Sequence, residues 1–537
     1  MQLLGFKGRQ ILILIDTLKK AIKFFPKKKA IICGTHHWTY QEFYNRITRL
    51  AYALKSYGID KDDKVAILHP NCHYFLEAYF AISQLGAVAV PINYRLSPQE
   101  IAFILHDSNS KVLIADPLFQ KQIDSIRDTT PGIERIIWTG EKHKITKPND
   151  FHYEEILACT FDSPCQEPAI TAENIAQIYY TSGTTGRAKG VMLSHKNVFT
   201  HALGTIAELQ LTDKDVWIHV APLFHLADAW ATWAITLVGG THVLVPEFDP
   251  KILFESIEKE SVTLTNLIPT MLNVMVNHPD VKKYDYSSLR LLLSGGAPIA
   301  REVVQKVIET FKCDYIQTYG MTETSPYLTL SILKNHLKQL PHNDQLRYKA
   351  KTGREFINVE LKVVDNQGKE IAPNEKEVGE IIVKGDIVTS GYWNLPEETA
   401  NLIKDGWLFT GDLAVIDEEG YITIVDRKKD VIITGGENVY STEVENVLYQ
   451  HSAILECAVI GVPDPLWGEA VKGIVVLKPN QEATENDIIQ FCKERIAHFK
   501  APKSIVFIDA LPKTGSGKIH KKELRDLYWE EYKKRVH

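Results

Sequence analysis

The sequence predicts an α/β protein with a large N-terminal domain of sheets and helices and a smaller α+β domain at its C-terminal end. Short apolar runs alternate with helical patterns along most of the chain, a rhythm typical of mainly parallel sheets covered by helices. Shorter strands and hairpin turns take over from 359 to 433, and 429–537 carries its own set of elements. A chain of 537 residues has room for two or more such domains.

The elements can be placed in order along the chain. In the first part we expect strands over 65–68, 87–90 and 112–115 and a helix over 73–85. After a glycine-rich loop come strands over 216–220, 242–245, 262–266 and 289–293 and a helix over 299–311, whose apolar residues fall on one face. The final elements lie at 431–434, 443–449, 457–461, 474–477, 486–498 and 504–508. The charged run 426–430 is the predicted boundary, which divides the chain into domains 1–428 and 429–537.

The composition argues against several classes of protein. A net charge of −6 argues against a general nucleic-acid binder. The seven cysteines are scattered and form no C-x-x-C pair, which indicates reduced thiols in a cytoplasmic protein. No apolar run approaches the ~20 residues that a membrane-spanning helix needs.

The N-terminal region is basic and carries a helical apolar pattern. Its first 29 residues contain eight Lys or Arg and one Asp, with Leu12, Ile15, Leu18, Ile22 and Phe25 at roughly helical spacing. We expect a helix packed against the body of the protein. The alternative is a helix on a membrane surface, which would give the protein a peripheral contact with lipid. A secretory signal is not expected, because the apolar core of five residues is too short.

A glycine-rich loop at 180–191, with the sequence YTSGTTGRAKGV, is the most informative motif. It follows the apolar end of a predicted strand, so backbone N–H groups are free to bind an anion. Glycines let the main chain approach a ligand oxygen, while hydroxyls and cations supply donors and charge. These residues are Thr181, Ser182, Gly183, Thr184, Thr185, Gly186, Arg187, Lys189 and Gly190. The loop predicts a phosphate site, with a ligand-free polar turn as the alternative. It is not a Walker P-loop, because the glycine spacing differs here and at 512–519.

Three further turns follow apolar runs, as expected if one ligand is gathered from several strand ends. The turn SGGAP at 294–298 offers bare backbone to an adenine ring. The segment QTYGMTET at 317–324 supplies Gln317, Tyr319, Thr322 and Glu323, and the Glu323 carboxylate suits Mg²⁺. In GWLFTGD at 406–412, we expect Asp412 at a strand end, where it suits ribose hydroxyls. Each turn taken alone also fits an ordinary structural role.

Five motifs in register identify a family. The segments YTSGTTGRAKGV, YGMTET, TGD, DRKKDVIITGGENVYSTEVE and PKTGSGKI occur in the order seen in adenylate-forming enzymes. The chain resembles the acyl-CoA synthetase branch of this AMP-binding superfamily from Leu12 to Tyr528. The resemblance implies five-layered αβαβα subdomains with a small β-barrel, followed by a mobile α+β lid.

The resemblance also implies an activity. Enzymes of this kind activate a carboxylic acid with ATP, release pyrophosphate, and transfer the acyl group from the adenylate to coenzyme A. We therefore expect an AMP-forming acid–thiol ligase that uses ATP, Mg²⁺ and coenzyme A. Its partners would be these molecules and a small carboxylic acid, without nucleic acid. Monomer and homodimer both remain open.

For the adenylation step, the resemblance assigns roles by position. Two anions must meet, so cations have to neutralise the developing charge, and Lys518 matches the family's catalytic lysine. Residues 181–189 would hold the β- and γ-phosphates, Glu323 and Thr184 the metal, and Thr322 the α-phosphate. Gln317, Tyr319, Gly295, Gly296, Ala297 and Pro298 would surround adenine, and Asp412 and Arg427 would bind ribose. An exposed turn is the alternative for 512–519, and a surface salt bridge for Arg427.

For the transfer to coenzyme A, related enzymes rotate the small domain. Lys429 sits at the matching hinge position, and Gly435 and Gly436 resemble the turn that lines the pantetheine tunnel; a simple hairpin bend is the alternative. His225 matches a histidine that closes the acyl site, although a packed core histidine is the plainer interpretation. Ala188 replaces the usual proline of the phosphate loop, which would loosen that loop slightly.

Acyl specificity is expected from 226–233, the 294–298 turn and the segment after Tyr319. These segments offer apolar and aromatic surface, including Trp230 and Trp233, and no obvious cation for a second carboxylate. A medium- or long-chain fatty acid is our first expectation, and an arylpropenoic or benzoic acid is the competitor. Asp228 fits neither acid, and we expect it to face solvent or cap a helix.

More distant alternatives are a ligase that loads an acyl carrier protein, a luciferase-like oxidative enzyme, and an inactive nucleotide-binding scaffold. The GGEN turn and the lack of an attached carrier domain favour coenzyme A over the first. The second calls for a light assay. A scaffold would not need a lysine on a second domain, so the third is the least expected.

Overall fold

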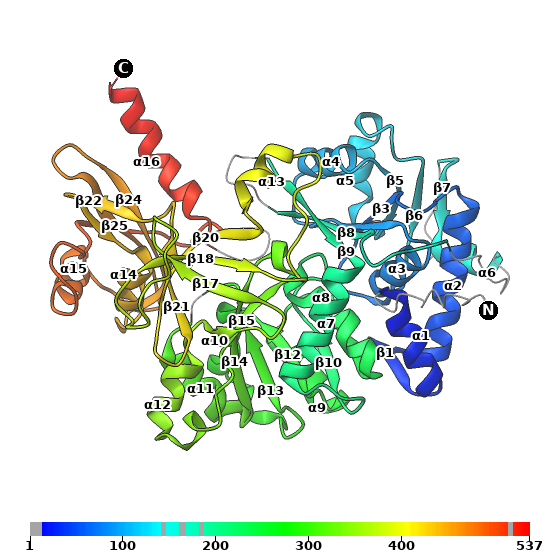
Figure 1. The fold of residues 1–537 in the computed structure, drawn as a ribbon, viewed down its shortest axis with the longest axis horizontal. Coiled ribbons are helices and arrows are strands. Elements are labelled where there is room, and N and C mark those ends of the chain that lie inside the picture. Colours follow the sequence, from blue (N-terminus) through cyan, green and yellow to red (C-terminus); the bar gives the residue numbers. More distant parts are fainter. Residues whose placement is uncertain are drawn as a thin grey trace, which may run out of the picture.

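The computed structural model describes residues 13–140, 147–159, 168–181, 187–297, 299–513 and 519–536. A large N-terminal domain of two sheets and three layers of helices is followed by a small C-terminal domain, so the predicted fold class is confirmed (Figure 1). The boundary at 428 and 429 stays a prediction.

The first sheet has seven strands in the order β7-β6-β5-β3-β4-β8-β9. All neighbouring pairs are parallel except β8 and β9, which form an antiparallel hairpin at one edge. The strands are β3 (Lys64–Leu68), β4 (Val88–Pro91), β5 (Ser110–Ala115), β6 (Arg135–Trp138), β7 (Asp150–His152), β8 (Ile175–Thr181) and β9 (Lys189–Ser194). Its outer face is covered by α4 (Pro98–Asp107) and α5 (Gln120–Ile126).

The second sheet begins with a mainly parallel part. This part contains β1 (Lys29–Cys33), β2 (His36–Thr39), β10 (Val216–His219), β11 (Thr241–Leu244), β12 (Leu264–Leu267), β13 (Leu291–Ser294) and β14 (Asp314–Gly320). Only β2 pairs antiparallel within it. Its outer face is covered by α9 (Pro250–Glu260), α10 (Pro269–Asn277), α11 (Arg301–Phe311) and α12 (His342–Lys349).

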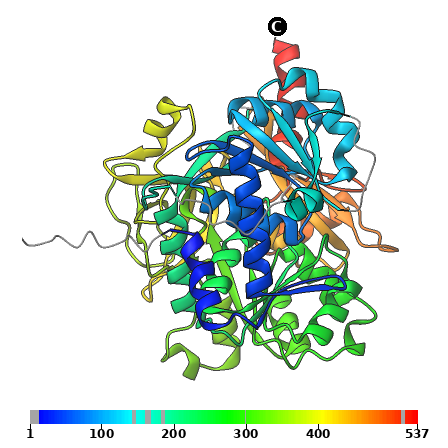
Figure 2. The ribbon, with the colours of Figure 1, turned by 90° about the vertical axis from the view of Figure 1, so that its right-hand side faces the viewer.

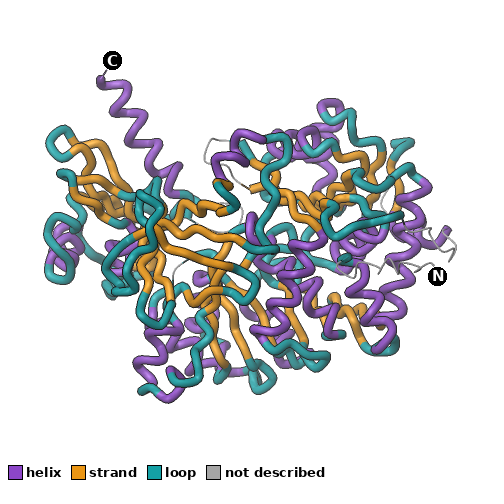
Figure 3. The backbone as a smooth tube through the Cα atoms, viewed as in Figure 1, coloured by secondary structure: helices purple, strands orange, loops and turns teal. Residues whose placement is uncertain are grey.

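The same sheet continues as antiparallel strands toward the small domain. They are β15 (Tyr327–Leu330), β16 (Gly353–Glu355), β17 (Glu360–Val364), β18 (Gly379–Lys384), β19 (Ile403–Lys404), β20 (Trp407–Ile416) and β21 (Tyr421–Arg427), with α13 (Pro396–Leu402) beside them. The tube view shows these strands on the side of the large domain that lies next to the small one (Figure 3). The last of them, β21, therefore leads directly into the small domain.

Helices buried between the two sheets form the central layer. They are α2 (Tyr40–Ser56), α3 (His73–Gln84), α7 (His195–Leu209) and α8 (Leu226–Val238), with α6 (Tyr153–Cys159) at the side. The start of α7 is fixed by a capping box, in which Ser194 and Asn197 exchange side-chain and backbone hydrogen bonds. Helix α8 ends at Gly239, whose φ of 77° is the left-handed conformation that glycine adopts readily.

The N-terminal helix α1 (Ile15–Phe24) packs against the body of the protein, as expected. Leu14, Ile15 and Leu18 are buried, and the helix lies beside α2 in both ribbon views (Figure 2). The part of the pattern before residue 13 lies outside the described residues. Among the residues described, no helix combines the length and apolarity that crossing a bilayer requires.

The small domain is a five-stranded sheet covered on both faces. It contains β22 (Ile432–Thr434), β23 (Glu437–Val439), β24 (Ile454–Asp464), β25 (Gly468–Leu477) and β26 (Ser504–Phe507). Helices α14 (Ser441–Leu448) and α15 (Glu485–Lys493) cover one face, and the start of α16 (Lys521–Val536) covers the other. Two apolar clusters, one on each face, give this domain a core of its own.

Candidate active site

The predicted phosphate loop joins two antiparallel strands at the edge of the first sheet. Thr181 at the end of β8 is the register partner of Lys189 at the start of β9. Ser182, Gly183, Thr184, Thr185 and Gly186 lie outside the described residues, so their roles stay predictions.

Tyr392 links the base of this hairpin to Glu323. The Lys189 Nζ atom lies 5.1 Å from the centroid of the Tyr392 ring, and the Tyr392 hydroxyl donates a 2.7 Å hydrogen bond to Glu323 Oε1. The Glu323 carbonyl accepts a 2.8 Å bond from the N–H of Thr389. The structure therefore brings together two predicted site residues from different sheets. Sequence reasoning missed Tyr392, because nothing in its local pattern shows what it contacts.

The surroundings of Glu323 fit a bound divalent cation. Thr322 and Glu323 belong to a short 3-10 turn, Thr322–Thr324, and Glu323 is buried. Burial raises the pKa of the Glu323 carboxyl, and the hydrogen bond from Tyr392 partly counteracts this. A nearby cation would favour the ionised form in the same way, and carboxylate oxygen is a ligand that Mg²⁺ prefers. Among the described residues, no group of three His, Cys, Asp or Glu side chains could hold a metal ion.

The predicted adenine turn is held against β14. Gln317 Nε2 donates a 2.9 Å hydrogen bond to the carbonyl of Ala297, while Gln317 Oε1 accepts one of 2.5 Å from the Tyr315 hydroxyl. A Cβ atom at Gly295 would collide with the Thr318 hydroxyl, so this close approach requires glycine. Gln317 thus fixes the turn through its side-chain amide. Pro298 lies outside the described residues.

The two residues expected at the ribose face each other across β20 and β21. Asp412 and Arg427 are register partners, and Arg427 Nε lies 3.0 Å from Asp412 Oδ1. The Tyr319 hydroxyl donates a 2.7 Å hydrogen bond to Asp412 Oδ2. One carboxylate therefore joins residues of the predicted adenine and ribose subsites, and it can still accept bonds from hydroxyl groups.

The expected position of Asp412 at a strand end was wrong. It lies inside β20, which runs from Trp407 to Ile416. Gly411 has a φ of 72°, and the pairing of β20 with β21 shifts register just after Asp412. The Gly-Asp pair therefore marks an irregularity within a long strand, where a side chain can be re-aimed, and not the end of the strand.

His225 caps the helix that was expected to form the acyl wall. Its side chain accepts a 3.1 Å hydrogen bond from the N–H of Ala227 at the start of α8. His225 is partly exposed. The carbonyl of Ala227, two residues further along the chain, accepts bonds from Asn266 Nδ2 at 2.7 Å and Trp230 Nε1 at 3.0 Å.

Asp228 neither faces solvent nor caps the helix, so both expectations for it were wrong. It is fully buried behind α8, where it accepts a 3.1 Å hydrogen bond from Trp217 Nε1 and pairs with His219 Nδ1 at 2.5 Å. His219 Nε2 in turn lies 2.9 Å from His242 Nδ1, and burial lowers the pKa of His242 well below its usual value. This chain of hydrogen bonds fastens helix α8 to strands β10 and β11. The sequence could not reveal it, because its members lie on three elements.

The two tryptophans of α8 have different surroundings. Trp230 packs against Trp217 and Tyr327, with ring centroids 4.9 and 5.3 Å away. Trp233 packs instead against Tyr79 and Phe80 of α3, at 5.9 and 4.8 Å. Only Trp230 therefore faces the sheet that carries the predicted nucleotide residues.

The predicted pantetheine turn is a tight hairpin in the small domain. Gly435 and Gly436 separate β22 from β23 and have φ values of 59° and 85°, as a two-residue hairpin turn requires. A Cβ atom at Gly435 would lie 2.8 Å from the indole of Trp467. Lys429 follows β21, and its carbonyl accepts a 3.2 Å bond from Arg525 of α16.

Lys518 lies outside the described residues, but the helix that follows it is anchored at the junction of the two domains. Lys521 Nζ lies 2.7 Å from both Glu445 Oε1 and Ser441 Oγ, and the Ser441 N–H donates a 2.5 Å bond to Asp426 of β21. Arg525 pairs with Asp430 at 2.6 Å. The start of α16 is thus tied to the segment that connects the domains.

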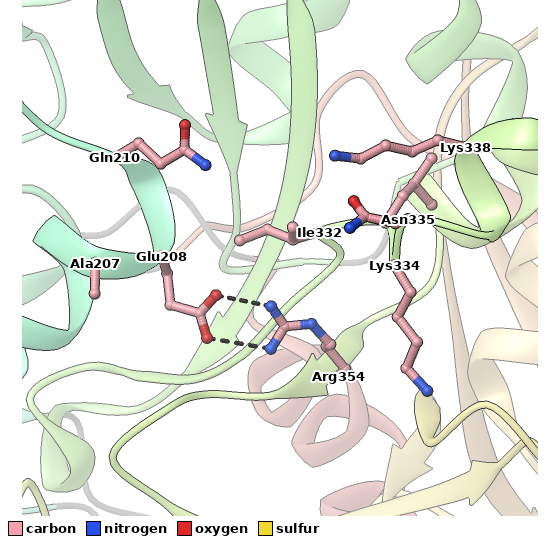
Figure 4. Close-up of a pocket in the computed structure, with 9 residues that line it drawn as sticks. Ala207, Glu208, Gln210, Ile332, Lys334, Asn335, Lys338 and Arg354 are labelled. Carbon is pink, nitrogen blue, oxygen red and sulfur yellow. Dashed lines mark hydrogen bonds and ion pairs between the residues drawn. The ribbon is translucent and has the colours of Figure 1, made fainter.

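A cavity of about 570 Å³ lies elsewhere on the large domain (Figure 4). It is lined by Ala207, Glu208, Gln210, Ile332, Leu333, Lys334, Asn335, Lys338 and Arg354. Arg354 forms a two-pronged ion pair with Glu208, and Gln210 and Lys338 approach from opposite walls. None of the predicted site residues lines this cavity.

Comparison with known proteins agrees with the geometry. The model of the AMP-binding enzyme family matches residues 18–393, and that of the AMP-binding enzyme C-terminal domain matches 443–518. The chain is 37% identical over 501 residues to a feruloyl-CoA synthase from an Amycolatopsis species, covering 93% of this chain and 96% of that one. It is 36% identical over 527 residues to a long-chain-fatty-acid–CoA ligase from Thermus thermophilus, covering 96% of each. The crystal structure of the anthranilate CoA ligase AuaEII with anthranoyl-AMP superposes with a TM-score of 0.86 at 28% identity, covering 96% of this chain and 97% of that one.

Proposed function

Because the chain belongs to the AMP-binding enzyme family and is an AMP-forming acyl-CoA ligase, we propose that it activates a monocarboxylic acid with a compact, aromatic body. The observation that carries this is the packing of α8. The ring of Trp230, fully buried, meets Tyr327 of β15 on the face of the helix where the acyl group is expected. The rings of Trp230 and Tyr327 can make favourable edge-to-face and stacked contacts with an aromatic ring of the substrate.

The described side chains around Trp230 supply no cation to pair with a second carboxylate. His201, whose ring lies 5.9 Å from that of Trp230, stays neutral because burial lowers its pKa to about 3. A dicarboxylic acid would therefore leave a buried charge without a partner. A medium- or long-chain fatty acid is the second candidate, supported by the identity to the ligase from Thermus thermophilus.

Each predicted site residue then has a task. Lys189 and the 181–186 loop bind the terminal phosphates, Asp412 and Arg427 hold the ribose hydroxyls, and the Gly295 turn receives adenine. When bound beside Glu323 and Thr184, Mg²⁺ neutralises phosphate charge. Lys518 places its charge between the attacking carboxylate and the α-phosphate, so the two anions can approach.

The second half-reaction needs access for a thiol. The sulfur of coenzyme A attacks the acyl carbonyl of the adenylate, the bond from carbonyl to phosphate oxygen breaks, and AMP leaves. We assign the Gly435–Gly436 turn to the narrow passage for the pantetheine arm and His225 to the mouth of the acyl site. Rotation of the small domain about Lys429 would move Lys518 away from the active site and bring the Gly435–Gly436 turn to it.

The test is ATP–pyrophosphate exchange with purified enzyme against acids of graded length and aromaticity. We expect the highest kcat/KM with a substituted aromatic or arylpropenoic acid, and the acyl-CoA thioester as the product by mass spectrometry. Highest activity with acids of 12 to 16 carbons would instead support the second candidate, a medium- or long-chain fatty acid. Absence of exchange with every acid, in enzyme that still binds ATP, would contradict the function itself.

A further inference from the structure

Two segments expected around the acyl group, α8 and the strand after Tyr319, meet the end of β12 at the first turn of α8. The carbonyl of Ala227 receives Asn266 Nδ2 from the end of β12 and Trp230 Nε1 from the same helix. The ring of Tyr327 from β15 lies 5.3 Å from that of Trp230. Helix α8, the end of β12 and strand β15 thus form one wall.

The same wall reaches the adenine turn. The Tyr327 hydroxyl lies close to the side chains of Trp230 and Thr318. The Thr318 hydroxyl donates a 3.1 Å hydrogen bond to the carbonyl of Ser294, the residue before Gly295. The Tyr327 hydroxyl therefore lies between the helix that follows His225 and the turn expected to bind adenine.

Asn266 Oδ1 and the Tyr327 hydroxyl are among the buried side-chain atoms in this region that have no hydrogen-bond partner of normal geometry among the described residues. Asn266 and Tyr327 are 5% and 3% exposed. Because the carbonyl of Ala227 requires a donor, the amide nitrogen of Asn266 must face it, and the free oxygen is an acceptor. The hydroxyl of Tyr327 can both donate and accept.

Such atoms are costly to leave unpaired. A buried polar group without a partner destabilises the fold, so a pair of them in one wall can be satisfied by a polar group of a bound ligand. The ligand group must donate a hydrogen bond to Asn266 Oδ1. It must also be neutral, because the described side chains around it are aromatic and include no cation. A hydroxyl group meets both conditions, whereas a carboxylate meets neither.

We propose that Asn266 and Tyr327 bind a hydroxyl group carried by the acyl part of the substrate, so that the enzyme selects a hydroxylated acid over its deoxy analogue. This inference rests on the proposed function, since it assigns the same acyl site. Asn266 accepts the hydroxyl proton, and Tyr327 donates to the hydroxyl oxygen. An acid without the group leaves both side chains unpaired, which lowers kcat/KM by about 10- to 100-fold.

The test compares matched pairs of acids in ATP–pyrophosphate exchange. The pairs are 4-hydroxycinnamic and cinnamic acid, 4-hydroxybutanoic and butanoic acid, and 12-hydroxydodecanoic and dodecanoic acid. We expect the hydroxylated acid to have the higher kcat/KM by about 10-fold or more in at least one pair. In Tyr327→Phe and Asn266→Leu, the ratio of kcat/KM for the hydroxylated acid to kcat/KM for the deoxy acid falls toward one.

Tyr286→Phe is the matched control, because it removes a buried hydroxyl that bonds to the carbonyl of Val281 in the outer layer. It should leave the ratio unchanged. Without substrate, Tyr327→Phe should be at least as stable as the wild type, since it removes an unpaired group. The hydroxylated acid should raise the wild-type Tm more than that of the variant.

The outcomes separate the inference from the function. Good exchange in the wild type with equal kcat/KM within every pair would overturn the inference and leave the ligase function standing. A preference that survives in Tyr327→Phe and Asn266→Leu would also overturn it, because other groups would then read the hydroxyl. If no acid supports exchange, the proposed function fails, and the inference fails with it.

Discussion

The Tyr392 hydroxyl donates a 2.7 Å hydrogen bond to the Glu323 carboxylate, joining the base of the β8–β9 hairpin to the turn that follows β14. Glu323 is buried, and burial raises its pKa. The fold therefore favours the protonated form of a carboxyl that the proposed reaction needs ionised. Such a residue serves function at the expense of stability.

Glu323→Gln should separate these two effects. Above the unfolded pKa of about 4.3, the unfolded chain loses this proton more easily than the folded one, so wild-type stability declines as the pH rises through the folded pKa. The neutral variant escapes this decline. We expect it to have a higher Tm than the wild type at pH 7.5, an advantage that disappears below about pH 4. Exchange activity should fall by about 100-fold or more. A variant that is less stable at pH 7.5 would contradict this account of Glu323.

Buried histidines predict a loss of stability in acid. Burial lowers the pKa of His195 to about 4 and that of His201 to about 3. Below the unfolded value of about 6.5, the unfolded chain binds protons that the folded chain does not, so stability falls as the pH falls. At pH 5 each histidine should contribute a loss of about 2 kcal/mol. Urea unfolding at pH 7.5 and pH 5 measures this, and His201→Gln should reduce the difference by about 2 kcal/mol. An unchanged difference would refute the assignment.

Arg427 should matter for ATP and little for stability. Its side chain is 51% exposed, so its pair with Asp412 contributes little to folding. If both residues bind ribose, Arg427→Ala should raise KM for ATP by about 10- to 100-fold with a nearly unchanged Tm. Lys428→Ala is the control, because that side chain is 56% exposed and pairs with Glu380. Equal effects of the two substitutions would argue against a ribose role.

Gly435→Ala should impair the transfer to coenzyme A selectively. The substitution places a methyl group 2.8 Å from the Trp467 indole on a backbone with a φ of 59°. We expect slower thioester formation from a preformed acyl adenylate, with ATP–pyrophosphate exchange retained. Gly420→Ala controls for strain alone, since Gly420 has a φ of 78° and open space around it. Equal loss of both half-reactions in Gly435→Ala would contradict a role confined to the second step.

Local patterns predicted the elements well and the side-chain contacts poorly. The expected strand over 65–68 is β3, and the expected helix over 73–85 is α3, because apolar periodicity reports which face is buried. The layered fold followed from the resemblance. The predicted position of Asp412 was wrong, because a Gly-Asp sequence occurs both in tight turns and within bent strands.

The contacts of the site depend on residues far apart in the chain. Tyr392 is 69 residues from Glu323, and Asn266 meets the carbonyl of Ala227 across 39 residues. Asp228 looked like a surface residue because its partner His219 belongs to the preceding strand, and only the packing of α8 on the sheet buries the pair. Motifs predicted which residues bind the nucleotide, but not the contacts that orient those residues.

The central claim is that one lysine from the small domain completes a site built by the large one. Its most direct test is Lys518→Ala, measured in the two half-reactions separately. We predict that acid-dependent ATP–pyrophosphate exchange is lost, while ATP binding and thioester formation from a preformed acyl adenylate are kept. Exchange at the wild-type rate in this variant would contradict the claim.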